Sequence, residues 1–228
     1  MGFLDAVGSF CSGVATFVSS IAESAISIAA RVVPIAVRIA VPVLNVISAI
    51  VEVVQVLAVL LNIIKPHEKL EDVGEKVIQA GEMGITLESC GNDFQKYKER
   101  IDSFEIDPEK AKARPVEDKQ LAAIAYVERG LLSCSAYLGI NNLYPLLALQ
   151  KDFFSPERIR AYAEAAMEAG FNLNKLKGYF DGTCTFSERN RIESFLHSAE
   201  KAFDPAYDTK KFADTLSNVS SNMRSYLN

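Results

Sequence analysis

The chain has 228 residues, enough to bury a sizeable core as one domain or as one domain with an appendage. Its formal net charge of −5, without a basic stripe carrying interleaved aromatic residues, argues against a nucleic-acid partner. Its four cysteines lie far apart with no C-x-x-C pair, which indicates reduced thiols rather than a zinc site or a disulfide scaffold.

The N-terminal sequence MGFLDAVGSF lacks the basic region of a secretory signal, and the hydrophobic run that follows is too long for one. We therefore expect a protein that is soluble in the cytoplasm of its producer and leaves it by a route that reads no cleavable signal. No lysine occurs before Lys65, so the apolar residues are concentrated in the first part of the chain.

The run from residue 21 to residue 64 is apolar except for a narrow set of polar positions, and its only charges are Glu23, Arg31, Arg38 and Glu52. Nearly every polar residue in the run is found by counting from Ser20 in intervals of alternately four and three residues. This is helical spacing, so in a helix these residues would lie on one face as a single stripe. In an oligomer inside a membrane, such a stripe can face a water-filled lumen while the apolar surface faces lipid. The candidate pore-lining residues are Ser24, Ser27, Arg31, Arg38, Asn45, Ser48, Glu52, Gln55 and Asn62.

The length of this run predicts two passes rather than one. A helix over these residues would measure roughly 66 Å, about twice the hydrocarbon thickness of a bilayer. Pro34 and Pro42 lie near the midpoint in the stretch RVVPIAVRIAVP, and proline removes a backbone donor and clashes with the preceding turn. We therefore expect a kink or a hairpin apex between residues 34 and 45.

No uncharged stretch of this run reaches the 18 residues typical of a constitutive membrane span. A central Arg or Glu costs about 2.5 to 3.5 kcal/mol on insertion scales, so the run favours a protein that is soluble first and inserted later. A second interpretation remains open, in which the run is the central helix of a globular bundle and its polar stripe meets solvent along one edge.

The residues after 65 predict a helical domain. We expect a helix after Pro115, one between Ser155 and Gly170, one opened by a capping box of Thr185 and Glu188, and one from about residue 209 to 226. Residues 104–118, with two prolines and dense charge, are interpreted as a linker. The prediction is an all-α fold of seven to nine helices: a hydrophobic insertion segment at residues 1–66, forming a long helix or helical hairpin, and a soluble bundle at 67–228.

Catalytic patterns are missing from the sequence. There is no G-x-S-x-G, H-E-x-x-H, P-loop or G-x-G-x-x-G, and the two histidines, His67 and His197, are expected to be half-exposed or capping residues. We therefore expect no catalytic residue, no metal site and no cofactor, and a protein that is not an enzyme.

The segment SAISIAARVVPIAVRIAVPVLNVISAIVEVVQVLAVLLNII, within residues 12–64, resembles in organisation the small pore-forming antibacterial effectors of bacterial type VI secretion systems. The resemblance implies loading in the secretion tube protein, insertion in the inner membrane of a target cell, self-oligomerisation there, and depolarisation by ion leakage. It also implies a cognate immunity protein in the producer's membrane. The alternative is a non-enzymatic helical adaptor or chaperone-like protein whose hydrophobic helix docks on a partner.

Overall fold

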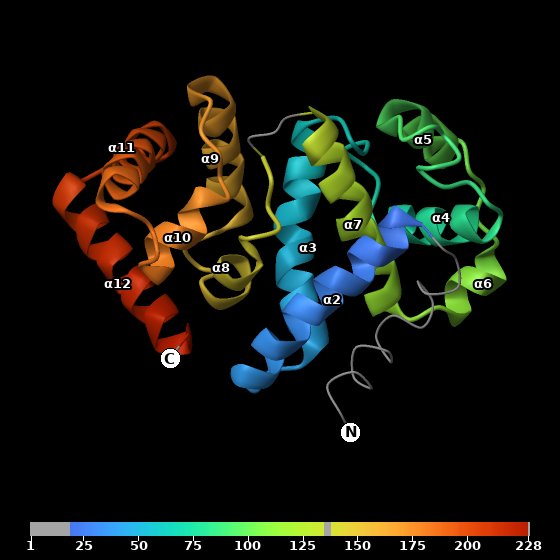
Figure 1. Ribbon diagram of the computed structural model, residues 1–228, viewed down its shortest axis with the longest axis horizontal. Helices are drawn as coiled ribbons and strands as arrows, with labels where there is room; N and C mark the ends of the chain where they lie inside the picture. The colour runs from blue at the N-terminus through green and yellow to red at the C-terminus, as the bar shows by residue number, and fades with distance from the viewer. Residues whose placement is uncertain (1–18, 135–137, 228) are drawn as a thin grey trace. The chain divides into compact units, whose positions relative to one another are not determined.

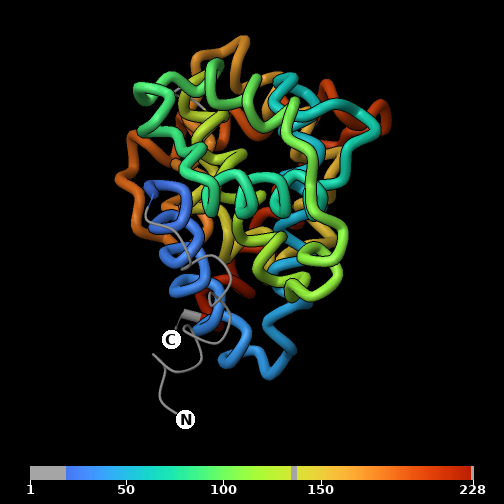
Figure 2. Tube along the Cα trace, turned by 90° about the vertical axis from the view of Figure 1, so that its right-hand side faces the viewer, coloured from blue at the N-terminus to red at the C-terminus, as the bar shows by residue number. Residues whose placement is uncertain are grey.

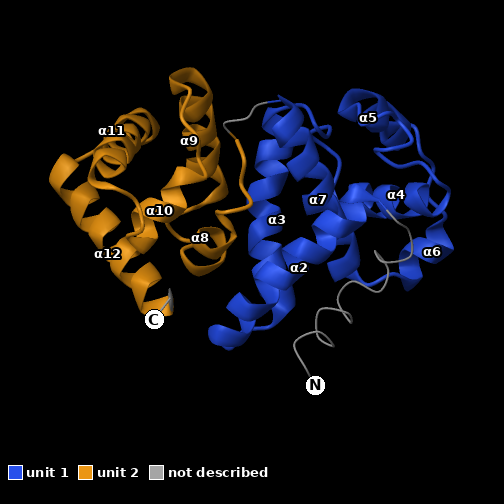
Figure 3. Ribbon diagram, in the orientation of Figure 1, with its two compact units in different colours: residues 1–134 blue, residues 135–228 orange. Residues whose placement is uncertain are grey.

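The computed structural model describes residues 19–134 and 138–227 of the chain, which contain eleven helices and no strand (Figure 1). The predicted all-α fold is confirmed, although the helices outnumber the seven to nine expected. The chain divides into two compact units, residues 1–134 and 135–228 (Figure 3). The division therefore lies at 134/135, and the apolar run shares unit 1 with the helices that follow it, whereas we predicted a boundary at 66/67.

Unit 1 is built around one central helix. Its helices are α2 (Ser20–Arg38), α3 (Val43–Leu60), α4 (Leu70–Glu82), α5 (Phe94–Asp102), α6 (Pro108–Ala113) and α7 (Val116–Cys134). The segment of α7 from residue 120 to 127 is buried without interruption, and α2, α3, α4 and α5 all contact this helix. Because every side of that segment is covered, α7 is the core against which the apolar run packs.

Two glycines allow the close packing around α7. A Cβ atom on Gly74 of α4 would lie 1.8 Å from the backbone oxygen of Lys119, and one on Gly130 of α7 would lie 2.8 Å from side-chain atoms of Ile63 and Phe94. No real Cβ makes contacts this short, so the backbone of α4 reaches α7 only because residue 74 has no side chain.

The charged segment 104–118 contains helices where we expected a linker. Asp107 caps α6, since its side chain accepts hydrogen bonds from the backbone N–H groups of the helix's second and third residues, and Pro108 opens that helix. Gln79 of α4 holds the cap in place: its Nε2 donates to the Asp107 carbonyl at 3.0 Å, and the Asp107 N–H donates to its Oε1 at 2.8 Å. Arg114 then bridges Glu75 and Glu82 of α4, at 3.1 and 2.8 Å.

Unit 2 contains α8 (Tyr144–Leu149), α9 (Pro156–Ala169), α10 (Lys175–Asp181), α11 (Phe186–Phe203) and α12 (Thr209–Leu227). The predicted helix ends are confirmed. Ser155 caps α9 and Gly170 ends it in a left-handed conformation, while Thr185 and Glu188 form the capping box of α11.

The core of unit 2 contains a buried carboxylate with three hydrogen bonds. Glu200 of α11 is 3% exposed and accepts from Arg158 of α9 at 2.9 and 3.1 Å and from the Tyr162 hydroxyl at 2.7 Å. Burial, reinforced by this carboxylate, raises the pKa of Tyr162 far above its usual range, so its hydroxyl stays a donor. The pairing joins α9 to α11 through a specific geometry.

Candidate functional site: the N-terminal hairpin

The apolar run folds as a helical hairpin in unit 1, with α2 and α3 in contact and residues 39–42 between them (Figure 2). Their 19 and 18 residues correspond to roughly 28 and 27 Å, close to the hydrocarbon thickness of a bilayer. By length and composition, both helices can cross a membrane, a property that core helices of soluble proteins share. The hairpin form of the predicted fold is thus present.

The turn of the hairpin is a Schellman motif formed without glycine. Ala40 has a left-handed backbone with φ of 54°, and its N–H donates to the Val37 carbonyl at 3.3 Å. The Val41 N–H donates to the Ala36 carbonyl at 3.1 Å, which completes the motif. Pro42 is the residue immediately before α3 and makes no side-chain cap hydrogen bond, whereas Pro34 lies inside α2 and the helix continues through it. Of the two residues predicted to form a hairpin or a kink, Pro42 lies at the hairpin turn and Pro34 does not.

The inner faces of the two helices are lined by alanine and branched aliphatic residues. These faces contact α7 and each other. The buried side chains of α2 and α3 are Ile21, Ala22, Ala25, Ile28, Ala29, Val32, Val33 and Ala36, and Val46, Ile47, Ile50, Val53, Val54, Leu57 and Ala58. The hydrophobic effect and van der Waals packing stabilise the contacts between these faces, because the side chains that form them carry no polar atom.

The start of α2 is held by polar contacts from distant parts of unit 1. The Ser20 N–H donates to the Glu88 carboxylate at 2.7 Å, and Arg129 of α7 donates from Nη2 to the Ser24 hydroxyl at 3.2 Å. Desolvation opposes the charge on Glu88, but hydrogen bonds to the carboxylate from Ser20, from the backbone of Glu88 itself and from Thr86 together outweigh it and lower its pKa to about 2. A carboxylate at a helix N-terminus also interacts favourably with the helix dipole.

The end of α3 is held in the same way. The side chain of Gln55 donates to the Glu68 carbonyl at 2.9 Å and accepts from the Leu70 N–H at 3.1 Å, which ties α3 to the start of α4. Asn62 ends α3 in a second Schellman motif, with φ of 55°. We call the contacts of Glu88, Arg129 and Gln55 the base contacts of the hairpin.

Most of the predicted polar stripe faces solvent in this structure. The exposed members are Ser27, Arg31, Arg38, Asn45, Glu52 and Asn62, and the half-buried ones are Ser24, Ser48 and Gln55. Three of the nine have a structural role here: Ser24 and Gln55 in the base contacts, and Asn62 as a helix end. In the folded chain, the polar stripe therefore lies along a solvent-exposed edge of the hairpin.

The sequence did not reveal the base contacts. Glu88 and Arg129 lie 68 and 105 residues from their partners in α2, so no local spacing links them. Glu88 belongs to a short turn that precedes α5, and Arg129 lies next to Glu128 in the second half of α7. The packing of α2 on α7 brings Arg129 to the start of the hairpin, and the turn that contains Glu88 meets it there from another part of unit 1.

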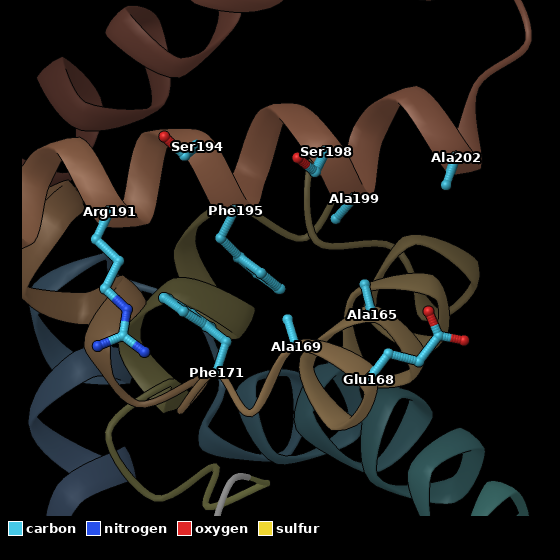
Figure 4. A pocket seen from close by; sticks show the side chains of 10 residues that line it. All are labelled: Ala165, Glu168, Ala169, Phe171, Arg191, Ser194, Phe195, Ser198, Ala199 and Ala202. Atoms are coloured by element: carbon cyan, nitrogen blue, oxygen red, sulfur yellow. The ribbon is translucent and has the colours of Figure 1, made fainter.

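Unit 2 has a groove between α9 and α11 of about 500 Å³ (Figure 4). Small residues line much of it, and Phe171 and Phe195 are stacked at its edge with ring centroids 3.9 Å apart. Arg191 and Glu168 also line it. It is a shallow apolar surface without convergent polar groups.

The described residues contain no group of three or more His, Cys, Asp or Glu side chains that could hold a metal ion. His67 is exposed, and His197 is half-buried with its Nδ1 hydrogen-bonded to the Tyr207 hydroxyl. The chain matches no known protein family, and no curated protein and no solved structure matches it. Its function must therefore be inferred from its own residues and their arrangement.

Proposed function

We propose that this protein permeabilises membranes: the α2–α3 hairpin leaves its place on α7, inserts in a target bilayer and forms ion-permeable pores with copies of itself. The observation that carries the proposal is a hairpin of two helices of membrane-spanning length with a polar stripe along an exposed edge.

The amino-acid composition of the hairpin would allow its helices to replace their contacts with α7 by contacts with lipid. Its buried faces are aliphatic, and lipid tails offer such faces an equally apolar environment. The charges of Arg31, Arg38 and Glu52 would each cost about 2.5 to 3.5 kcal/mol at the centre of a bilayer. An oligomer that turns these side chains toward water removes most of that cost.

The base contacts would keep the hairpin folded before insertion. They are polar and directional, and they lie at the start of α2 and in the second half of α3 rather than at the turn. Because the pKa of Glu88 is about 2, its contact with Ser20 persists at mildly acidic pH. In this proposal, contact with the membrane or with other copies releases the hairpin, and mild acidification does not.

The biological setting that we propose is that of an antibacterial toxin of the type VI secretion class. The chain would travel in the secretion tube protein, insert in the inner membrane of the target cell and collapse its potential, with no enzymatic step. A membrane-located immunity protein would protect the producer. The organisation of residues 12–64, which resembles such effectors, supports this setting.

Conductance across a planar bilayer tests the proposal directly. The purified full chain should produce current steps, and R38L and E52L should change single-channel conductance or ion selectivity, since both exposed side chains belong to the stripe. R160L is the matched control, because Arg160 is an exposed arginine on α9 of unit 2. A protein that neither conducts nor depolarises cells when directed to the periplasm of a test bacterium would overturn the proposal.

The second candidate function is that of a helical adaptor. The observation in its favour is the groove between α9 and α11, whose small side chains leave room for a partner helix (Figure 4). An adaptor would stay dispersed in solution and bind no liposomes, and R38L would change only its solubility or stability. A bilayer recording therefore separates the two functions.

A further inference from the structure

The hairpin tip, which we define as residues 37–42 with the sequence VRIAVP, is an exposed apolar surface. Val37 is 72% exposed and Val41 is 37% exposed, and Ala40 and Pro42 are exposed beside them. In both views of the backbone the tip lies at the outer end of the hairpin, beyond the other helices of unit 1 (Figures 1 and 2). Among residues 19–134, no other helix of unit 1 extends to this end of the hairpin (Figures 1 and 2), so these apolar side chains stay exposed there.

The charge at the tip has one sign. Arg38 is the only ionisable residue within it, and Arg31, also exposed, lies two helical turns earlier on the same face of α2. The nearest acidic residues of the hairpin are Glu23 and Glu52, roughly 22 Å along α2 from Arg38 and roughly 15 Å along α3 from Pro42. Both separations exceed the Debye length of about 8 Å in physiological salt, so neither acidic residue neutralises the charge of Arg38 at the tip.

From this geometry we propose that the hairpin tip docks on the surface of a bilayer that carries anionic headgroups, before any pore forms. A protruding apolar tip of this size can enter the boundary between headgroups and acyl chains. Val37 and Val41 would then enter the apolar layer, and Arg38 would reach back to lipid phosphates. The inference rests on the proposed function, since it supplies the first step of insertion.

Co-sedimentation of the full chain with large unilamellar vesicles tests the docking step. Vesicles of phosphatidylcholine with 30% phosphatidylglycerol, a composition chosen for the test, should bind at least tenfold more tightly than vesicles of phosphatidylcholine alone. One arginine near an anionic surface contributes enough to change the affinity about fivefold, so R38Q should weaken binding by about that factor. V37S should weaken binding to both compositions, because it removes apolar area without changing charge.

Two control variants lie in unit 2. R160Q removes an exposed arginine and F186S removes an apolar side chain that is 80% exposed, and neither should change vesicle binding. Equal binding of both compositions, or wild-type binding by R38Q and V37S, would overturn the docking proposal. Loss of self-association in the tip variants, with unchanged vesicle binding, would assign the tip to a second copy of the chain and overturn it as well.

Release of an entrapped dye separates this proposal from the proposed function. Tip-dependent binding without dye release would support docking and contradict pore formation. Dye release that is equal for neutral and anionic vesicles and insensitive to R38Q would support pore formation and contradict docking.

Discussion

The α2–α3 hairpin and unit 2 bury apolar surface in different ways. The hairpin contains no aromatic residue, and its buried faces consist of alanine, valine, isoleucine and leucine. Unit 2 packs phenylalanine and tyrosine rings in edge-to-face and stacked pairs, and it joins α9 to α11 through Glu200 and Arg158. Aromatic ring pairs and buried ion pairs are favourable only in one relative position of the helices that carry them. Aliphatic helix faces can exchange their protein contacts for contacts with lipid tails at little cost.

This contrast suggests that the two regions respond differently to a membrane. Unit 2 has directional contacts in its core that a change of arrangement would break. The hairpin has its directional contacts at its base and along one side, through Glu88, Arg129 and Gln55. The variants below test this comparison by weakening one region at a time.

The largest effect is expected for G74A, which disturbs the packing of α4 on α7 in unit 1. The new Cβ would lie 1.8 Å from a backbone oxygen, which cannot move aside as a side chain would, so we expect a loss of about 3 kcal/mol or more in unfolding free energy. Urea denaturation measures it. The control is G178A in α10, whose Cβ meets only ordinary contacts, the nearest at 3.5 Å; there we expect no loss, since alanine favours helix. Equal stability of G74A and the wild type would contradict the close approach.

A similar loss, of about 3 kcal/mol, is expected in unit 2 for R158A, because it leaves the Glu200 carboxylate buried without its cation. R160A removes a solvent-exposed pair on the same helix and should change stability by less than about 0.5 kcal/mol. Thermal unfolding of both variants gives the comparison. If the two variants unfold alike, the ion pair does not hold α9 to α11.

A smaller effect is expected at the base of the hairpin for E88Q. The folded pKa of Glu88, about 2, lies below its ordinary value of 4.5, so its contribution is present above about pH 4.5 and is lost as pH falls toward 2. Glu88 is exposed, and after allowance for solvent screening we expect about 1 kcal/mol at pH 7.

Hydrogen exchange of the α2 amides is the measurement for E88Q, because it reports local opening of the hairpin start. The variant should exchange faster at pH 7, and the wild type should approach the variant as pH falls below 4.5. E99Q on α5 serves as the control, because Glu99 is an exposed carboxylate that accepts a hydrogen bond from Gln95 of its own helix. A pH-independent difference would show that the charge of Glu88 is not what holds α2.

The smallest expected effect is a gain in stability, and it concerns the turn between α2 and α3. Ala40 adopts a left-handed backbone that glycine adopts without cost, so A40G should stabilise unit 1 by about 0.5 to 1 kcal/mol. The chevron or the urea midpoint detects this gain. A40G should leave vesicle binding by the tip unchanged, because it removes only one methyl group from it.

Local patterns in the sequence were sufficient to predict the hairpin break and several helix ends after residue 115. Ser155, Thr185 with Glu188, and the hairpin break near Pro42 are signals within four residues of the features they mark. Helix α6 was missed because dense charge and two prolines are typical of loops, while its stability depends on Gln79 and Arg114, which join it to α4.

The candidate site was predicted only in part, for a related reason. The polar stripe could be predicted because the sequence alone gives the spacing of the polar residues along a helix. Its solvent exposure depends on the packing of the hairpin on α7, which follows the hairpin by more than fifty residues, and the base contact of Arg129 depends on the same helix. The domain boundary was placed at 66/67 because hydropathy changes there, yet α7 unites the chain across that point into one unit.

The position of α7 in the chain also has a consequence for synthesis. About 74 residues separate the end of α3 from the end of α7, which ribosomes translate in about 4 to 15 s. During that interval the hairpin exists without the helix that covers its apolar faces. The proposed function therefore requires that nascent chains be kept from nearby membranes and from one another until residue 134 has emerged.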